Sequence, residues 1–216
     1  MSDRLLERMG AACGIVFVVL LIVGPSIGGL TSPVAFFLEV LAFLFFLFFL
    51  GRLWSALHRA EGGSGWLSAT AFGAGLMAIT IKLGSAAPVL AARQRVGDGL
   101  DPQLARALQD MNDASFVLTF FPLAVLLAAF AIVAIRSGAL PRWLGWIAAV
   151  ISVSFIAGGM AGSANLESEW AGLPMILFTF WVIAASVVLI RRAGEPRPVE
   201  KDTSVGGAAP VGRARP

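Results

Sequence analysis

The chain has 216 residues, of which 58% are hydrophobic and 13% are charged, and its mean hydropathy is +0.85. Soluble domains carry about half apolar and about a quarter charged residues, so this chain has too little charge to cover a water-facing surface. The composition excludes an ordinary soluble enzyme, a disordered chain and a free nucleic-acid-binding protein. It predicts an integral membrane protein whose main partner is the lipid bilayer.

Six runs are long and apolar enough for a helix to cross the hydrocarbon core, which takes about 20 residues. They are 10–30, 34–53, 66–91, 114–135, 143–162 and 171–190. We interpret the first run as a retained span, because no small-x-small cleavage site of a signal peptide follows it. Pro25 is expected to kink this span or end it early. The prediction is an all-α, six-span domain over 1–192.

The basic residues predict the orientation of these spans in the membrane. With both termini in the cytoplasm, twelve lysines and arginines fall on the inner side and three on the outer side, and this bias sets topology. The net charge of +3 is therefore a topology signal, and no nucleic-acid partner is expected. The inner twelve are Arg4, Arg8, Arg52, Arg59, Arg136, Arg142, Arg191, Arg192, Arg197, Lys201, Arg213 and Arg215.

Tryptophan placement agrees with this topology, because an amphipathic indole prefers the membrane–water interface. Trp170 falls at the predicted outer interface, whereas Trp181 lies mid-span and is expected to pack inside the bundle. The tryptophans predicted at the inner interface are Trp54, Trp66, Trp143 and Trp146.

The outer segment 92–113 is the one long connection between spans. Asp101 followed by Pro102 predicts a helix start, with Asp101 as N-cap and a short amphipathic helix that can continue into the fourth span. Within that span, Pro122 cannot donate to the carbonyl of Leu118, so a kink or local opening is expected. Segment 193–216 is rich in Pro, Gly and charge, which predicts a disordered cytoplasmic tail.

No catalytic motif appears in the sequence. There is no GxSxG, HExxH or P-loop pattern, and the single Cys13 and single His58 cannot build a metal cluster, so we expect no enzyme activity, cofactor or metal. Small residues four apart let helices approach closely, either within the chain or in a homo-oligomer. These pairs are Gly10/Gly14, Gly24/Gly28, Ala71/Gly75 and Gly158/Gly162.

Two ionisable residues lie inside predicted spans, Glu39 in the second and Lys82 in the third. A charge at mid-bilayer costs about 2.5–3.5 kcal/mol on insertion scales, so such residues face the interior and tend to pair. At about 1.5 Å per residue, their depths below the outer surface differ by only about 6 Å. We therefore predict that the two side chains form an ion pair in the outer half of the bundle.

Further polar residues lie at matching depth in the outer half. Ser85 shares a face of the third span with Lys82, and Asn112, Ser115 and Thr119 share a face leading into the fourth span. With Glu39 they could line a pocket open to the outside. The alternatives are a structural ion pair with incidental hydroxyls, and a proton relay.

Three segments resemble parts of a family of small actinobacterial multi-pass membrane proteins classed as a domain of unknown function. They are LPRWLGWIAA at 140–149, DPQLARALQDMNDASFVLTFFPLA at 101–124 and FWVIAASVVLI at 180–190. The resemblance implies six spans and a bacterial plasma membrane, and it carries over no catalytic residue. Asn112, Asp113 and Pro122 lie in its most recognisable stretch.

Two functions follow from these observations. The first is a non-enzymatic membrane protein that binds a ligand or partner through the outer pocket and segment 92–113. The alternative is a small carrier or proton-coupled permease that uses Glu39 and Lys82, which suits a division into two sets of three spans. A cavity continuing past Lys82 toward the cytoplasm would favour the carrier, and a closed inner half would favour the first function. A membrane enzyme is the weakest reading, because no nucleophile and base are visible.

Overall fold

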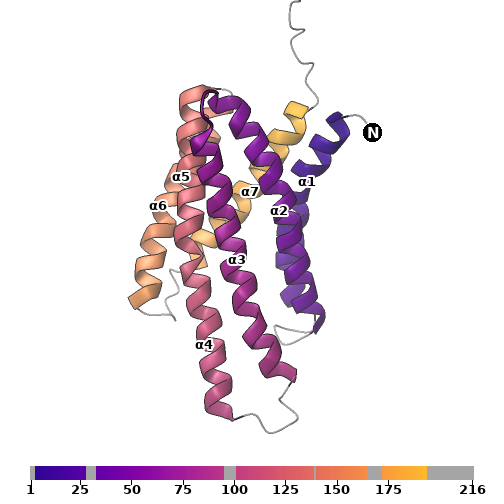
Figure 1. The fold of residues 1–216 in the computed structure, drawn as a ribbon, viewed down its shortest axis with the longest axis vertical. Coiled ribbons are helices and arrows are strands. Elements are labelled where there is room, and N and C mark those ends of the chain that lie inside the picture. The colour runs from indigo at the N-terminus through magenta and orange to yellow at the C-terminus, as the bar shows by residue number, and fades with distance from the viewer. Residues whose placement is uncertain (1–2, 28–32, 95–100, 139, 165–171, 194–216) are drawn as a thin grey trace, which may run out of the picture.

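The structure is a computed structural model that describes residues 3–27, 33–94, 101–138, 140–164 and 172–193. The described residues fold into a bundle of α-helices (Figure 1). The helices are α1 (Asp3–Ser26), α2 (Pro33–Glu61), α3 (Trp66–Gln94), α4 (Pro102–Leu118), α5 (Phe120–Ser137), α6 (Arg142–Ala164) and α7 (Gly172–Ala193).

Six stretches of helix are long and apolar enough to cross a membrane, as the sequence predicts. Helices α4 and α5 together make one of them, Pro102–Ser137, and α1, α2, α3, α6 and α7 supply the others. The observed helices extend beyond the predicted spans at the ends that carry charge, because a helix does not stop where the hydrocarbon does. Trp170 and residues 194–216 of the predicted tail lie outside the described residues.

Consecutive spans run in opposite directions, so the bundle has two distinct ends (Figure 1). We call the end near Asp3, Glu61, Ser137 and Ala193 the basic end, which lies at the top of Figure 1, and the other the distal end. The adjoining halves are the basic half and the distal half. Helices α3 and α4 reach furthest at the distal end.

Large apolar side chains cover the outside of the bundle as well as its interior. Val153 is 67% exposed and Phe180 is 67% exposed, a pattern that would be unfavourable in water and is expected for lipid-facing helices. Inside, α1 packs chiefly against α2 and α7, and α5 packs against α3 and α6. In this interior the Trp181 indole Nε1 of α7 donates to the Leu144 carbonyl oxygen of α6 at 3.3 Å.

Several of the paired small residues lie where two helices approach closely. A Cβ at Gly158 would come within 2.9 Å of the Pro174 side chain, and one at Gly162 within 2.9 Å of Val117. A Cβ at Gly14 would meet Phe49 at 2.7 Å. The expectation of close packing within the chain is therefore confirmed at these positions. Gly28 lies outside the described residues.

The α2–α3 turn depends on glycine and on a carboxylate cap. Gly62, Gly63 and Gly65 all have φ near +60°, in the left-handed region that glycine adopts without steric cost. The Glu61 carboxylate then accepts from the backbone N–H groups of Leu67 at 2.9 Å and Ser68 at 2.8 Å. These bonds satisfy donors in the first turn of α3 that have no partner within the helix.

The fourth span begins and breaks where the sequence predicts. Asp101 caps α4 by accepting from the Gln103 backbone N–H at 2.9 Å, with Pro102 in the first turn. Thr119 alone separates α4 from α5, three residues before Pro122. Its backbone stays in the right-handed helical region, with φ −66° and ψ −18°, and its N–H still donates to the Ser115 carbonyl oxygen at 3.1 Å. Figure 1 shows α5 continuing α4 with little change of direction, so the missing donor opens the helix locally rather than bending it sharply.

Candidate ligand cavity

The distal half of the bundle contains a cavity of about 270 Å³ between α1, α2, α3, α7 and the α4–α5 junction. Three of its lining residues are polar, namely Glu39, Lys82 and Thr119. The apolar lining residues are Phe17, Leu21, Phe43, Phe46, Ala78, Ile79, Phe116, Leu123, Met175 and Phe178. The cavity therefore has a charged edge and an apolar body.

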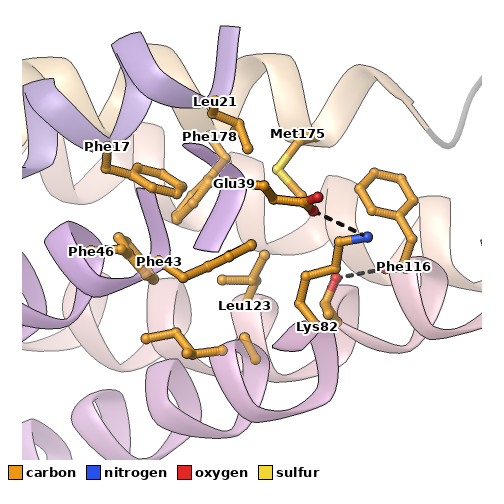
Figure 2. A pocket seen from close by; sticks show the side chains of 13 residues that line it. Phe17, Leu21, Glu39, Phe43, Phe46, Lys82, Phe116, Leu123, Met175 and Phe178 are labelled. Atoms are coloured by element: carbon orange, nitrogen blue, oxygen red, sulfur yellow. Dashed lines mark hydrogen bonds and ion pairs between the residues drawn. The ribbon is translucent and has the colours of Figure 1, made fainter. Parts of the chain in front are cut away.

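Glu39 and Lys82 form the predicted ion pair at the edge of this cavity (Figure 2). The Lys82 Nζ lies 3.5 Å from the Glu39 Oε1, and the two side chains are 16% and 37% exposed respectively. The Lys82 Nζ also lies 6.0 Å from the centroid of the Phe116 ring, within range of a cation–π interaction. The antiparallel course of α2 and α3 places the two residues at the same level, as the depth argument requires.

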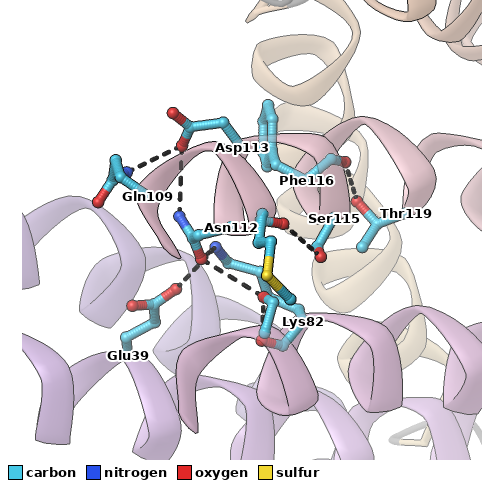
Figure 3. Close-up of polar contacts among 10 residues, drawn as sticks. Glu39, Lys82, Gln109, Asn112, Asp113, Ser115, Phe116 and Thr119 are labelled. Atoms are coloured by element: carbon cyan, nitrogen blue, oxygen red, sulfur yellow. Dashed lines mark hydrogen bonds and ion pairs between the residues drawn. The ribbon is translucent and has the colours of Figure 1, made fainter. Parts of the chain in front are cut away.

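Asn112 on α4 holds the other side of the Lys82 ammonium. The Lys82 Nζ donates to the Asn112 Oδ1 at 3.2 Å, and the Ser85 Oγ lies 3.4 Å from the same oxygen. Figure 3 shows Asn112 between Lys82 and Asp113. The Asn112 Nδ2 donates to the Asp113 Oδ1 at 3.4 Å, and the Gln109 Nε2 donates to that oxygen at 3.0 Å. Polar contacts thus run from the cavity edge to the exposed surface of α4.

The structure separates the six predicted site residues into three groups. Glu39, Lys82 and Thr119 line the cavity, and Ser85 and Asn112 contact Lys82 without lining it. Ser115 does not line the cavity, and its hydroxyl donates to the Met111 carbonyl oxygen of its own helix at 2.7 Å. The Thr119 hydroxyl also donates within its helix, to the Phe116 carbonyl oxygen at 2.6 Å.

Sequence reasoning missed the aromatic wall of the cavity. The Phe17 ring centroid on α1 lies 4.6 Å from that of Phe46 on α2, which in turn lies 5.9 Å from that of Phe178 on α7. A signal was available on α2, where Glu39, Phe43 and Phe46 are spaced i, i+4, i+7 and so share one face with the charge. Phe17 and Phe178 offered no such signal, because their spans are apolar on all sides.

Tightly packed side chains close the cavity toward the basic end. Phe49 and Trp181 follow Phe46 and Phe178 along α2 and α7, and their exposed fractions are 0% and 2%. Trp181 packs edge-on against Phe130, with ring centroids 4.8 Å apart, which confirms its predicted packing role. The layer also contains Leu50, Leu126 and Leu127, each at most 1% exposed. The cavity therefore ends at mid-bundle in this structure.

Comparison of the chain with protein-family models, curated proteins and solved structures finds no match. The candidate site therefore depends on the geometry alone. That geometry is a hollow with a paired cation and anion at its edge and phenylalanine rings along its wall.

Proposed function

We propose that this chain is a non-enzymatic membrane protein that binds a small amphipathic molecule in the distal cavity. The apolar part of the molecule occupies the space between the phenylalanine rings, and its polar head lies at Glu39 and Lys82. The observation that carries the proposal is the coexistence of an apolar hollow and a charge pair in one cavity.

The charges of Glu39 and Lys82 at the cavity edge indicate which polar head group the ligand carries. One carboxylate and one ammonium leave no net charge among the described lining residues, so a ligand with a net charge would leave one group without a partner. A zwitterionic head suits both groups, with its carboxylate at Lys82 and its ammonium at Glu39. The cavity of about 270 Å³ is small beside the typical range of about 300–1,000 Å³ for drug-sized ligands, so the apolar part is short.

Binding is favoured over transport by the packed layer beneath the cavity. A carrier would have to open the layer that contains Phe49 and Trp181 to expose the ligand at the basic end, and these side chains are almost fully buried. The proposal assigns the protein to a bacterial plasma membrane with both termini in the cytoplasm and the cavity toward the outside. The basic-residue asymmetry and the resemblance of 101–124 to the actinobacterial family support this location.

Thermal unfolding of the detergent-purified protein tests the proposal. Apolar amino acids with a free zwitterionic head should raise the melting temperature, whereas their N-acetylated and amidated forms should raise it much less. The Ala78→Phe variant fills the cavity and should abolish the rise, because Ala78 is a buried lining residue. The Ala69→Phe variant places the same side chain on an exposed position of α3 and should retain it.

Two outcomes would count against the proposal. Stabilisation that persists in Ala78→Phe would place the ligand elsewhere, and a complete lack of stabilisation by the panel would exclude a zwitterionic amino-acid head. Uptake of the stabilising compound by proteoliposomes, driven by a proton gradient and lost in Glu39→Gln, would instead establish the carrier. Binding without uptake supports the proposal.

A further inference from the structure

A second pocket lies at the basic end, at the opposite end of the bundle from the ligand cavity. It has a volume of about 300 Å³ and is lined by residues of α1, α2 and α7 and by Leu140 in the α5–α6 connection. Three arginines line it, Arg52, Arg59 and Arg192, together with the carboxylate of Glu7. Among the described lining residues, positive charge therefore exceeds negative charge by two.

Glu7 holds two of these arginines at one side of the pocket. The Arg52 Nη2 lies 3.2 Å from the Glu7 Oε2, and the Arg59 Nη2 lies 3.6 Å from the Glu7 Oε1. The Arg52 side chain is 8% exposed and that of Arg59 is 54% exposed, so the basic surface runs from the interior of the bundle out to solvent. Arg192 reaches the same pocket from α7 and has no counterpart carboxylate among the described lining residues.

The surroundings place this pocket at the level of the lipid headgroups. Trp54, two residues after Arg52, is 40% exposed, and an exposed indole prefers the membrane–water interface. The remaining pocket lining is apolar, with Leu140 and Leu189 among it. A basic pocket between helices, bordered by apolar side chains at headgroup depth, matches the chemistry of an anionic phospholipid: a phosphate above an apolar tail.

We propose that this pocket binds the phosphate group of an anionic phospholipid from the adjoining leaflet. Guanidinium groups present several N–H donors in a planar fork, and they bind phosphate oxygens with charge-assisted hydrogen bonds. A phosphate bound by Arg59 and Arg192 links α2 to α7 beside Glu7 of α1. Because α1 packs chiefly on α2 and α7, the bound lipid stabilises the packing of these three helices at the basic end. The inference is independent of the ligand cavity.

Lipid titration with matched variants tests the site. The purified protein is placed in nanodiscs of phosphatidylcholine with increasing phosphatidylglycerol, and its melting temperature is measured. Phosphatidylglycerol should stabilise the wild type, and the double variant Arg59→Gln/Arg192→Gln should lose most of that gain. The control Arg136→Gln/Arg191→Gln also removes two positive charges, from exposed positions at the same end of the bundle but outside the pocket, and should keep the gain.

Native mass spectrometry of the same variants gives a second readout that does not depend on stability. Retained phosphatidylglycerol should fall at least tenfold in Arg59→Gln/Arg192→Gln and less than twofold in the charge-matched control Arg136→Gln/Arg191→Gln. Equal losses in both would show general surface attraction and overturn the proposal, as would equal retention in all three proteins. Inorganic phosphate and glycerol 3-phosphate are tested in detergent: stabilisation by either at millimolar concentration, with none by the lipid, would overturn the lipid source.

Discussion

Phe49 on α2 lies in the basic half of the bundle and is fully buried, whereas Phe43, less than two helical turns away, lines the distal cavity and stays partly exposed. The two levels contain the same apolar residue types, yet the interior beside Phe49 is filled and the interior beside Phe43 is hollow. In the basic half, Trp181 and Phe130 pack edge-on against each other and are 2% and 1% exposed. In the distal half, Glu39 of α2 and Lys82 of α3 form an ion pair at the edge of the cavity.

The difference shows how a membrane protein can keep a hollow in an otherwise dense interior. Lys82 of the ion pair donates to Asn112 on α4, and neither charged side chain fills the cavity beside it. The phenylalanine rings nearby contact one another around the hollow without closing it. This difference in packing is the basis of the proposed binding function.

The largest expected effect is on a topology reporter, whose signal is either external or cytoplasmic. It tests which half of the bundle faces outward. Fusions after Gly99 and after Ser168, both outside the described residues, should read as external, which would place the hollow half outside. The basis is the excess of lysine and arginine at the opposite end. A cytoplasmic reading at either position would contradict the six-span orientation.

Truncation of a phenylalanine ring should cost more unfolding free energy in the basic half than in the distal half. Phe49→Ala should lower the free energy of unfolding by about 3 kcal/mol, because it opens a cavity in a filled layer. Phe43→Ala should cost less than half as much, since that ring already borders empty space. The measurement is equilibrium unfolding in detergent micelles. Equal losses for the two variants would mean that the hollow is filled in the working protein.

Removing one partner of the Glu39–Lys82 ion pair should lower the free energy of unfolding more than removing both partners. Lys82→Met leaves the Glu39 carboxylate without its cation in the bundle, and Glu39→Gln leaves the ammonium without its anion, whereas the double variant leaves neither. The double-mutant cycle should show a coupling of about 0.5–3 kcal/mol in unfolding free energy. Additive single effects would show that Asn112 and water, rather than the partner, satisfy each charge.

The smallest expected effect lies at the distal tip of α4. Asp101→Ala removes the cap that accepts from the Gln103 N–H, and should destabilise the first turn by about 1 kcal/mol. Hydrogen exchange at the Gln103 amide should accelerate accordingly, while Asp110→Ala, an exposed change on the same helix, should leave it unaltered. Equal exchange in both variants would show that this tip does not depend on its cap.

Much of the fold follows from local physics that the sequence carries on its own. Hydrocarbon thickness sets the minimum length of the spans, the missing donor of Pro122 predicts the local opening near Thr119, and Asp101 before Pro102 predicts the start of α4. The Glu39–Lys82 pair was also predictable, because two isolated charges in hydrocarbon at one depth have few other ways to lower their energy.

The tertiary structure alone decided which apolar residues surround the cavity and which face lipid. Phe17 and Phe178 line the cavity, whereas Phe180 is 67% exposed, yet all three occur in uniformly apolar runs. In a soluble protein the polar residues of a helix mark its exposed face, so the opposite, apolar face can be identified as the buried one. Lipid tails are as apolar as the bundle interior, so buried and lipid-facing positions of such a helix do not differ in hydrophobicity. Only the packing of the spans against one another therefore determines which rings are buried.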